Sequence, residues 1–196
     1  MSNSAPPPGR QKRPPVAAAS PGPARAAAAE ILIAVLTRKA LLETALERYC
    51  APAAFSPRDR AFVHNLVLTT LRRLGEIETA IAACLERPLP PSALHTRITL
   101  ALGACQILFL RTPAHAAVAT SVALAEAGGA AHLKGLVNAV LRRIARAPES
   151  FLAGDDAARV NTPDWLWARW SAAFGEDICR RIAEAHLAPP PLDLSV

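Results

Sequence analysis

Apolar residues recur every three or four positions in several stretches of this chain, and prolines or glycines separate those stretches. Ser56 precedes Pro57 and Asp59 at the start of the clearest one, an order typical of an N-cap, a first-turn proline and a capping box. The expected buried stripe comprises Phe62, Val63, Leu66, Val67, Thr70, Leu71 and Leu74. Side chains at this spacing share one face of a helix, whereas a strand needs strict alternation. The stripe must therefore pack against other helices.

The same periodicity predicts helices along most of the chain. The expected spans are 24–38, 41–49, 57–74, 76–87, 92–110, 113–127, 133–146, 163–173 and 176–187. Segment 92–110 is apolar on most sides, which predicts a central helix surrounded by others. Aromatic residues make up only 5% of the chain, and its alanine and leucine content favours helices over strands. The predicted fold class is all-α: a helical bundle followed by a small helical linker subdomain.

Changes in composition divide the chain into four expected regions. They are a tail at 1–23, a helical domain at 24–146, a linker at 147–160 and the start of a further region at 161–196. The tail contains Arg10, Lys12 and Arg13 and no acidic residue. We expect it to be disordered, and either to contact phosphates or to be simply solvated.

All three tryptophans of the chain, Trp165, Trp167 and Trp170, lie in the expected helix 163–173. Thr162 is the predicted N-cap of that helix. The region after residue 161 has too little apolar surface to be stable alone. We therefore predict that the indole rings pack against a partner, either the core bundle or a part that this sequence lacks.

The net charge of +6 favours polyanions as partners, of which RNA and DNA are the commonest. Six arginines lie off the predicted apolar stripes: Arg58, Arg60, Arg72, Arg73, Arg142 and Arg143. One interpretation is that they contact RNA phosphates, which would fix position without reading sequence. The alternative is an ordinary solvated helix face, or ion pairs with Glu76 and Glu78.

No motif in the sequence indicates catalysis or a resident metal. There is no glycine-rich dinucleotide or phosphate loop, no HExxH and no GxSxG. The four cysteines form no CxxC pair, which suits a reducing compartment and argues against zinc or a disulfide framework. No apolar stretch approaches the ~20 residues of a membrane span, and the N-terminus is no secretory signal. We expect a cytoplasmic chain without membrane contact.

Three segments are similar to a known family. They are 58–73 (RDRAFVHNLVLTTLRR), 111–117 (RTPAHAA) and 134–143 (KGLVNAVLRR). Together they resemble the NusB-like helical domain over residues 29–146. By that resemblance, Arg25 and the tail lie where NusB relatives are basic and bind RNA. For His115 we expect a structural role, satisfying backbone or core hydrogen bonds, rather than ligand binding.

The continuation resembles the segment that leads into the catalytic domain of RsmB/Sun-type rRNA cytosine-5 methyltransferases. The matching segments are 161–170 (NTPDWLWARW), 175–176 (GE) and 185–192 (AHLAPPPL). That family's S-adenosylmethionine loop and two catalytic cysteines belong to the domain expected next, and no position here matches them, Cys179 included. The resemblance implies no cofactor in this chain, S-adenosylmethionine for the absent methyltransferase domain, and either a truncated gene product or an N-terminal fragment.

The leading hypothesis is thus an accessory domain that positions rRNA and packs on the methyltransferase domain through the tryptophan helix. The first alternative is a transcription antitermination factor of the NusB kind, against which residues 161–196 argue. The second is a helical protein-interaction module whose basic charge is incidental. A homo-oligomer is compatible with the sequence, but no feature of it indicates one.

Overall fold

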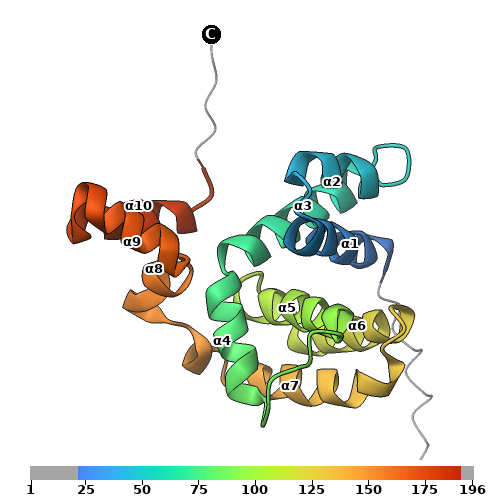
Figure 1. Cartoon of the computed structure of the whole chain (residues 1–196). Coiled ribbons are helices and arrows are strands. Elements are labelled where there is room, and N and C mark those ends of the chain that lie inside the picture. The colour runs from blue at the N-terminus through green and yellow to red at the C-terminus, as the bar shows by residue number, and fades with distance from the viewer. Residues whose placement is uncertain (1–21, 191–196) are drawn as a thin grey trace, which may run out of the picture.

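The computed structural model describes residues 22–190, so Arg10, Lys12 and Arg13 of the expected tail lie outside the described residues. All regular structure within 22–190 is helical, which confirms the all-α prediction (Figure 1). The bundle consists of α1 (Gly22–Arg38), α2 (Leu42–Tyr49), α3 (Pro57–Arg72), α4 (Leu74–Cys84), α5 (Leu94–Leu108), α6 (Ala114–Ala127) and α7 (Lys134–Arg146). None of the described helices is long and apolar enough to cross a bilayer.

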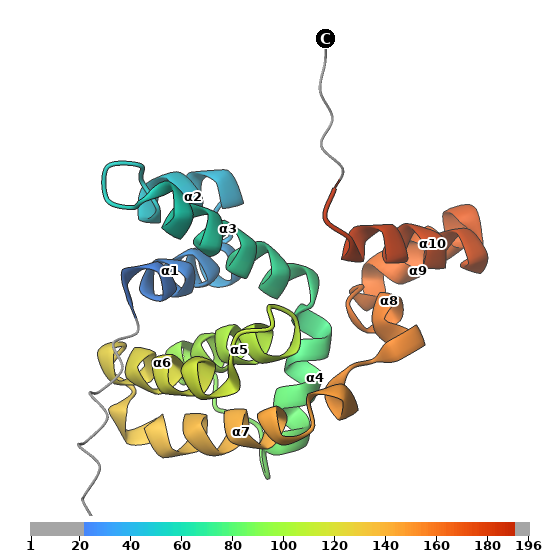
Figure 2. The same cartoon turned by 180° about the vertical axis from the view of Figure 1, so that it is seen from behind.

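α5 lies at the centre of the bundle, as its apolar composition predicts. It contacts α1, α3, α4, α6 and α7, and the two opposite views show it enclosed by them (Figures 1 and 2). Its buried residues run without interruption from Ile98 to Gln106. A helix that is buried on every side needs neighbours all round, and these residues supply the centre of the core.

The absence of a side chain at Gly103 lets α6 and α7 approach α5 closely. A Cβ at this position would lie 2.5 Å from Leu141 Cδ1 and 2.7 Å from Ser121 Oγ. α6 and α7 run antiparallel and are joined by the short 3₁₀ helix η1 (Ala131–Leu133). The start of α6 therefore lies beside the end of α7, an arrangement on which the candidate site depends.

The predicted N-cap of α3 is confirmed, and that of α9 is wrong. The Ser56 hydroxyl accepts a hydrogen bond from the Asp59 amide at 3.1 Å, which completes the cap of α3. At α9 the cap position is Pro163, with no side-chain cap. The Thr162 hydroxyl instead donates to the Ala158 carbonyl at 2.8 Å, because it terminates the preceding short helix.

Residues 148–187 continue as a chain of short elements that ends in a helical hairpin. The elements are η2 (Pro148–Phe151), η3 (Gly154–Asp156), α8 (Ala157–Val160), α9 (Asp164–Phe174) and α10 (Glu176–Leu187). Gly175 separates α9 from α10 with φ of 81°, a left-handed conformation that glycine adopts without strain. α8 contacts α4, and the hairpin stands beside α4, away from the rest of the bundle (Figures 1 and 2).

The first turn of α4 is the joint between the bundle and this C-terminal unit. A Cβ on Gly75 would overlap the Val160 carbonyl oxygen, so the two backbones meet where only glycine fits. Next to it Glu76 is 2% exposed. Its carboxylate accepts hydrogen bonds from Arg73 Nη1 at 3.0 Å and from the Ala153 amide at 3.2 Å. A buried carboxylate with several donors fixes the groups that surround it.

Candidate nucleic-acid interface

The structure divides the predicted arginines among separate places instead of gathering them on one face. Arg58 and Arg60 lie at the start of α3 beside α2, whereas Arg142 and Arg143 lie at the end of α7. α1 and α5 separate these two ends of the molecule (Figures 1 and 2). A polyanion bound at one end therefore does not reach the other by way of a continuous arginine row.

Arg25 is engaged inside the bundle. Its Nε donates to Gln106 Oε1 at 2.8 Å, and its guanidinium lies over the Phe62 ring, 5.0 Å from the centroid. Desolvation by burial lowers the pKa of this guanidinium from its usual value. The arginine that the resemblance assigns to RNA thus links α1 to α5 and α3.

Arg73 and Arg72 lie where α3 passes into α4, and both side chains are half-buried. The ion pair of Arg73 with Glu76 was one of the two alternatives for the arginine set, and the structure contains it. The same guanidinium lies 5.3 Å from the centre of the Phe109 ring. Glu78 pairs with Arg97 at 3.7 Å instead. Arg73 is therefore engaged in holding the joint at α4.

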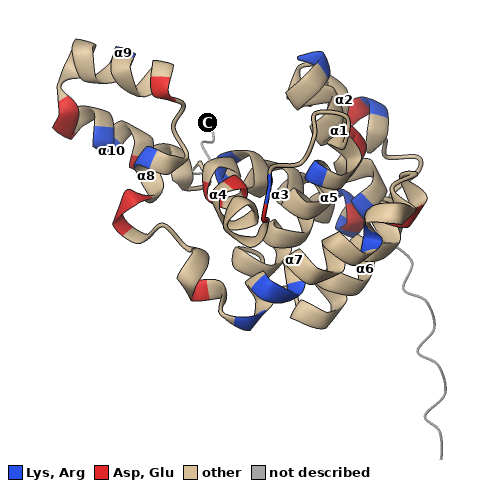
Figure 3. Cartoon of the chain, turned by 60° about the horizontal axis from the view of Figure 1, so that its bottom comes forward, with Lys and Arg blue, Asp and Glu red and all other residues tan. Residues whose placement is uncertain are grey.

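Arg142 and Arg143, by contrast, are exposed, as is Arg146 one turn further on. All three belong to the last turns of α7, and Figure 3 shows basic positions along that helix. Arg142 Nε donates to Asn138 Oδ1 at 3.0 Å. That bond orients the guanidinium and leaves its two terminal nitrogens without a partner among the described residues. Exposed, oriented guanidinium groups are suited to bidentate contact with phosphate.

Arg142 and Arg146 also line a groove of about 580 Å³ between α6 and α7, hereafter the α6/α7 groove. Its floor is apolar and consists of small side chains: Ala114, Val118, Ala119, Val122, Ala123 and Ala145. The polar side chains along it are His115, Glu126, Asn138, Arg142 and Arg146. Because the helices are antiparallel, His115 faces the arginine end. At the opposite end Lys134 Nζ pairs with Glu126 at 2.8 Å.

The groove brings together the two sequence segments 111–117 and 134–143. Arg142 was predicted as a contact residue, but His115 and Arg146 were not. The His115 side chain is exposed and makes no hydrogen bond to any described residue, so the expected role of satisfying backbone or core hydrogen bonds is wrong. Its position in the first turn of a helix suggested local hydrogen bonding. Only the antiparallel pairing of α6 with α7 shows that it shares a groove with arginines.

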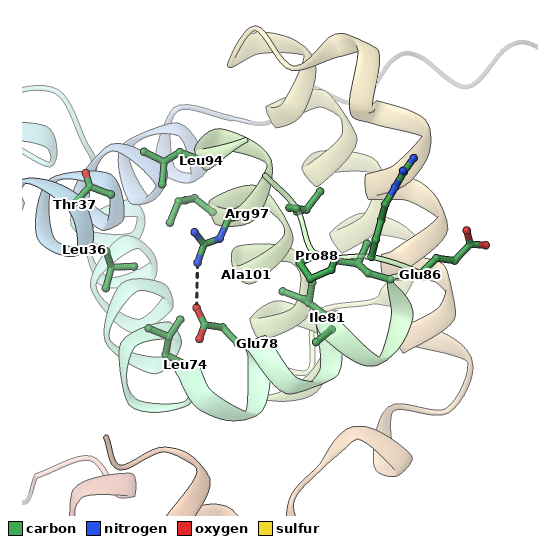
Figure 4. Close-up of a pocket in the computed structure, with 15 residues that line it drawn as sticks. Leu36, Thr37, Leu74, Glu78, Ile81, Glu86, Pro88, Leu94, Arg97 and Ala101 are labelled. Carbon is green, nitrogen blue, oxygen red and sulfur yellow. Dashed lines mark ion pairs between the residues drawn. The ribbon is translucent and has the colours of Figure 1, made fainter. Parts of the chain in front are cut away.

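A second groove, of about 640 Å³, lies between α4, α5 and the end of α1 (Figure 4). Leucine side chains line much of it, among them Leu36, Leu74 and Leu94. Arg97 points across it to Glu78, and this pair neutralises the charge there. An apolar groove with a paired charge suits a polyanion less well than the α6/α7 groove.

The three tryptophans have different surroundings. Two guanidinium groups lie over the Trp167 ring, that of Arg159 at 5.1 Å and that of Arg180 at 5.8 Å from the ring centroid. Trp170 packs edge-on against His186 of α10, with ring centroids 5.3 Å apart. Trp165 is 67% exposed. Two of the rings therefore pack within the C-terminal unit itself, and Trp165 is the one left on the surface.

The described residues contain no group of three or more His, Cys, Asp or Glu side chains placed to hold a metal ion. Burial raises the pKa of the Cys105 thiol to about 11. The Cys179 thiol is also buried, and it donates to the Trp167 carbonyl at 3.6 Å. Neither thiol lines either of the two grooves, and a thiol buried in apolar surroundings is a poor nucleophile.

These features define an all-α bundle with an arginine-bearing surface groove and an appended helical hairpin. The chain belongs to the NusB family, whose model matches residues 22–146. It is also similar to curated relatives named ribosomal RNA small subunit methyltransferase B. The relative from Xanthomonas campestris is 38% identical over 167 residues, which cover 84% of this chain and 37% of that protein.

Two further relatives with the same name come from Pseudomonas putida and Escherichia coli. The first is 35% identical over 178 residues, covering 88% of this chain and 39% of the relative. The second is 35% identical over 143 residues, covering 72% of this chain and 33% of the relative. The chain therefore spans between a third and two fifths of the length of these methyltransferases.

Proposed function

We propose that this chain binds ribosomal RNA as the accessory part of an S-adenosylmethionine-dependent rRNA (cytosine-5) methyltransferase, and that the end of α7 is its main contact surface. The observation that carries the proposal is the pair of exposed arginines Arg142 and Arg146 that line the α6/α7 groove, with Arg143 also exposed at the same end of α7. The names of the relatives, which are small-subunit rRNA methyltransferases, support ribosomal RNA as the polyanion.

The extent of the similarity favours this function over that of a NusB-type antitermination factor. The family model ends at residue 146. A match over 84% of a 196-residue chain is longer than residues 1–146 can supply. Similarity to the methyltransferases thus includes residues of the C-terminal unit, which lies beyond the family match.

The described residues do not fit S-adenosylmethionine. A nucleotide-type cofactor site of the usual kind has a glycine-rich turn between a strand and a helix, and the structure offers only helices over 22–190. In the proposed enzyme the cofactor supplies the methyl group and binds to the methyltransferase domain of the relatives. This chain's part is to hold the RNA and to dock that domain through exposed Trp165.

Binding to a small-subunit rRNA fragment, followed by fluorescence anisotropy over a range of salt concentrations, tests the RNA contact. The slope of log K against log salt is negative, and each lost phosphate contact makes it less steep by about 0.7–0.9. Arg142→Ala with Arg143→Ala is expected to reduce the steepness of this slope by about 1.5. The matched control is Arg58→Ala with Arg60→Ala, which removes the same charge from the far end of the molecule. Absence of binding even at about 50 mM salt would refute the RNA function.

Docking is tested by titrating the chain with the separately produced methyltransferase domain of a relative. Trp165→Ala is expected to weaken saturable binding, because an exposed indole is a typical centre of an interface. Saturable binding to that domain in the absence of any RNA binding would favour the protein-interaction module instead.

A further inference from the structure

The α6/α7 groove has two properties that a solvated helix face lacks. It is hollowed, with a volume of about 580 Å³, which falls within the range of small-ligand sites. Its floor is also apolar over its length, from Ala114 and Val118 to Val122 and Ala123. A phosphate chain needs only a basic surface, so the apolar floor points to a ligand with an apolar, flat component as well.

The polar groups of the groove are asymmetric. At one end are His115 and the guanidinium groups of Arg142 and Arg146, none of them in an ion pair with a described residue. At the other end the charge of Glu126 is balanced by Lys134. The groove thus presents unbalanced positive charge at one end of an apolar floor.

A nucleotide has the complementary arrangement, since a flat base adjoins an anionic phosphate. In an A-form duplex the bases are stacked and paired, and the faces that could lie on an apolar floor are not accessible. In an unpaired strand each base can turn out, lie against side chains and hydrogen-bond through its edges, while arginines contact the backbone. The groove therefore fits unpaired RNA better than duplex RNA.

We propose that the α6/α7 groove binds an unpaired nucleotide of RNA, with the base on the alanine floor next to His115 and the phosphate between Arg142 and Arg146. This inference rests on the proposed function and narrows its substrate to a single-stranded segment. The hydrogen bond from Arg142 to Asn138 holds one guanidinium in place before the RNA arrives, and such preorganisation lowers the entropic cost of binding.

The test fills the groove without changing its charge. Ala119 is exposed and lies on the floor, so Ala119→Trp blocks the space at little cost to the fold. Ala139 is an exposed alanine of α7 outside the groove, and Ala139→Trp is the matched control. The probes are a labelled pyrimidine RNA strand of about 12 nucleotides, within the span that single-strand sites cover, and the same strand annealed to its complement.

Ala119→Trp is expected to weaken binding of the unpaired strand about tenfold, the effect of losing one stacked base, and binding of the duplex less than twofold. Ala139→Trp should change neither. His115→Ala leaves the floor intact, and it should weaken binding of the unpaired strand more than binding of the duplex. Circular dichroism of each variant establishes that it is folded.

Two outcomes overturn the inference and leave the proposed function standing. In the first, Arg142→Ala weakens binding of both RNA probes, while Ala119→Trp and His115→Ala weaken binding of neither. The arginines would then contact only the phosphate backbone. In the second, a poly-glutamate peptide displaces the labelled RNA strand as effectively as unlabelled RNA does. The groove would then recognise negative charge alone. If the unaltered chain binds neither probe, the proposed function and the inference both fail.

Discussion

Asn161, in the segment between α8 and α9, forms two hydrogen bonds with Glu76 in the first turn of α4. Its Oδ1 accepts from the Glu76 amide at 3.1 Å, and its Nδ2 donates to Glu76 Oε2 at 2.7 Å. The two residues are 85 positions apart in the chain. A single side chain thus satisfies both the backbone amide and the carboxylate of a buried residue, and it ties the C-terminal unit to the bundle.

Asn161→Ala is expected to lower the free energy of unfolding by about 2 kcal/mol, because it leaves an amide and a buried carboxylate each short of a partner. Residues 147–163 should also become more sensitive to protease. Urea denaturation and limited proteolysis measure the two effects. The control is Asp164→Asn, which removes an ion pair with Arg159 on an exposed side chain and should cost less than about 0.5 kcal/mol. Equal effects of the two variants would contradict the role of Asn161.

Gly75→Ala and Gly135→Ala are expected to change stability in opposite directions. Both glycines lie in helices, where alanine is intrinsically preferred by about 1 kcal/mol. At Gly135 a Cβ meets nothing within 4 Å, so the unfolding temperature should rise by a few degrees. At Gly75 the Cβ overlaps the Val160 carbonyl, and the variant should lose at least about 2 kcal/mol. Stabilisation by both substitutions would disprove the close contact at the joint.

Cys105 should make stability depend on pH in the alkaline range. Burial raises the pKa of its thiol from 9.0 to about 11 in the folded chain. The unfolded chain releases this proton first, so the stabilisation is complete below pH 9 and is lost as the pH rises through 11. The loss should be about 2 kcal/mol. Urea denaturation between pH 8 and pH 11 follows it.

Cys105→Ala is the reference for that measurement. Cys50 and Cys84 also have raised pKa values because of desolvation, but they titrate alike in both proteins. The difference in unfolding free energy between the unaltered chain and the variant should therefore shrink above pH 9. A difference that stays constant to pH 11 would mean that the Cys105 thiol is not held protonated.

Trp167→Ala and Trp165→Ala compare the contribution to stability of a tryptophan packed inside the C-terminal unit with that of an exposed one. Trp167 is half-buried and in contact with the guanidinium groups of Arg159 and Arg180, and its loss should lower the free energy of unfolding by about 2 kcal/mol. Trp165, mostly exposed, should change it by less than about 0.5 kcal/mol. Urea unfolding with circular dichroism detection compares the two. A larger loss of unfolding free energy for Trp165→Ala than for Trp167→Ala would mean that the Trp165 indole is packed and not exposed.

Helix spans in the bundle could be predicted well, because they depend on patterns within a few residues. The cap at Ser56 and the break at Gly175 are set by local backbone geometry. The apolar stripe of α7 predicts its buried residues Val137, Val140, Leu141 and Ile144. Thr162 was predicted wrongly because a threonine near a proline can either cap the next helix or close the previous one, and the packing of α8 selected the second.

The candidate site could be predicted only in part. Arg142 was identified because it lies off an apolar stripe and is basic. The same reasoning selected Arg73, whose charge is balanced by Glu76, and Arg25, which is bonded to Gln106. An arginine that binds a partner and one that holds a fold have the same local pattern, and they differ in what lies opposite them.

Local sequence patterns are sufficient to establish that this chain forms helices and where most of them begin and end, and its composition establishes that basic residues outnumber acidic ones. Periodicity and capping determine these features because they act over one or two turns. Three features depend on how the helices pack: which arginines remain exposed, the groove that His115 shares with Arg142 and Arg146, and the burial of Glu76 against Asn161. Each of those depends on contacts between distant segments, whose energies appear only when the helices pack.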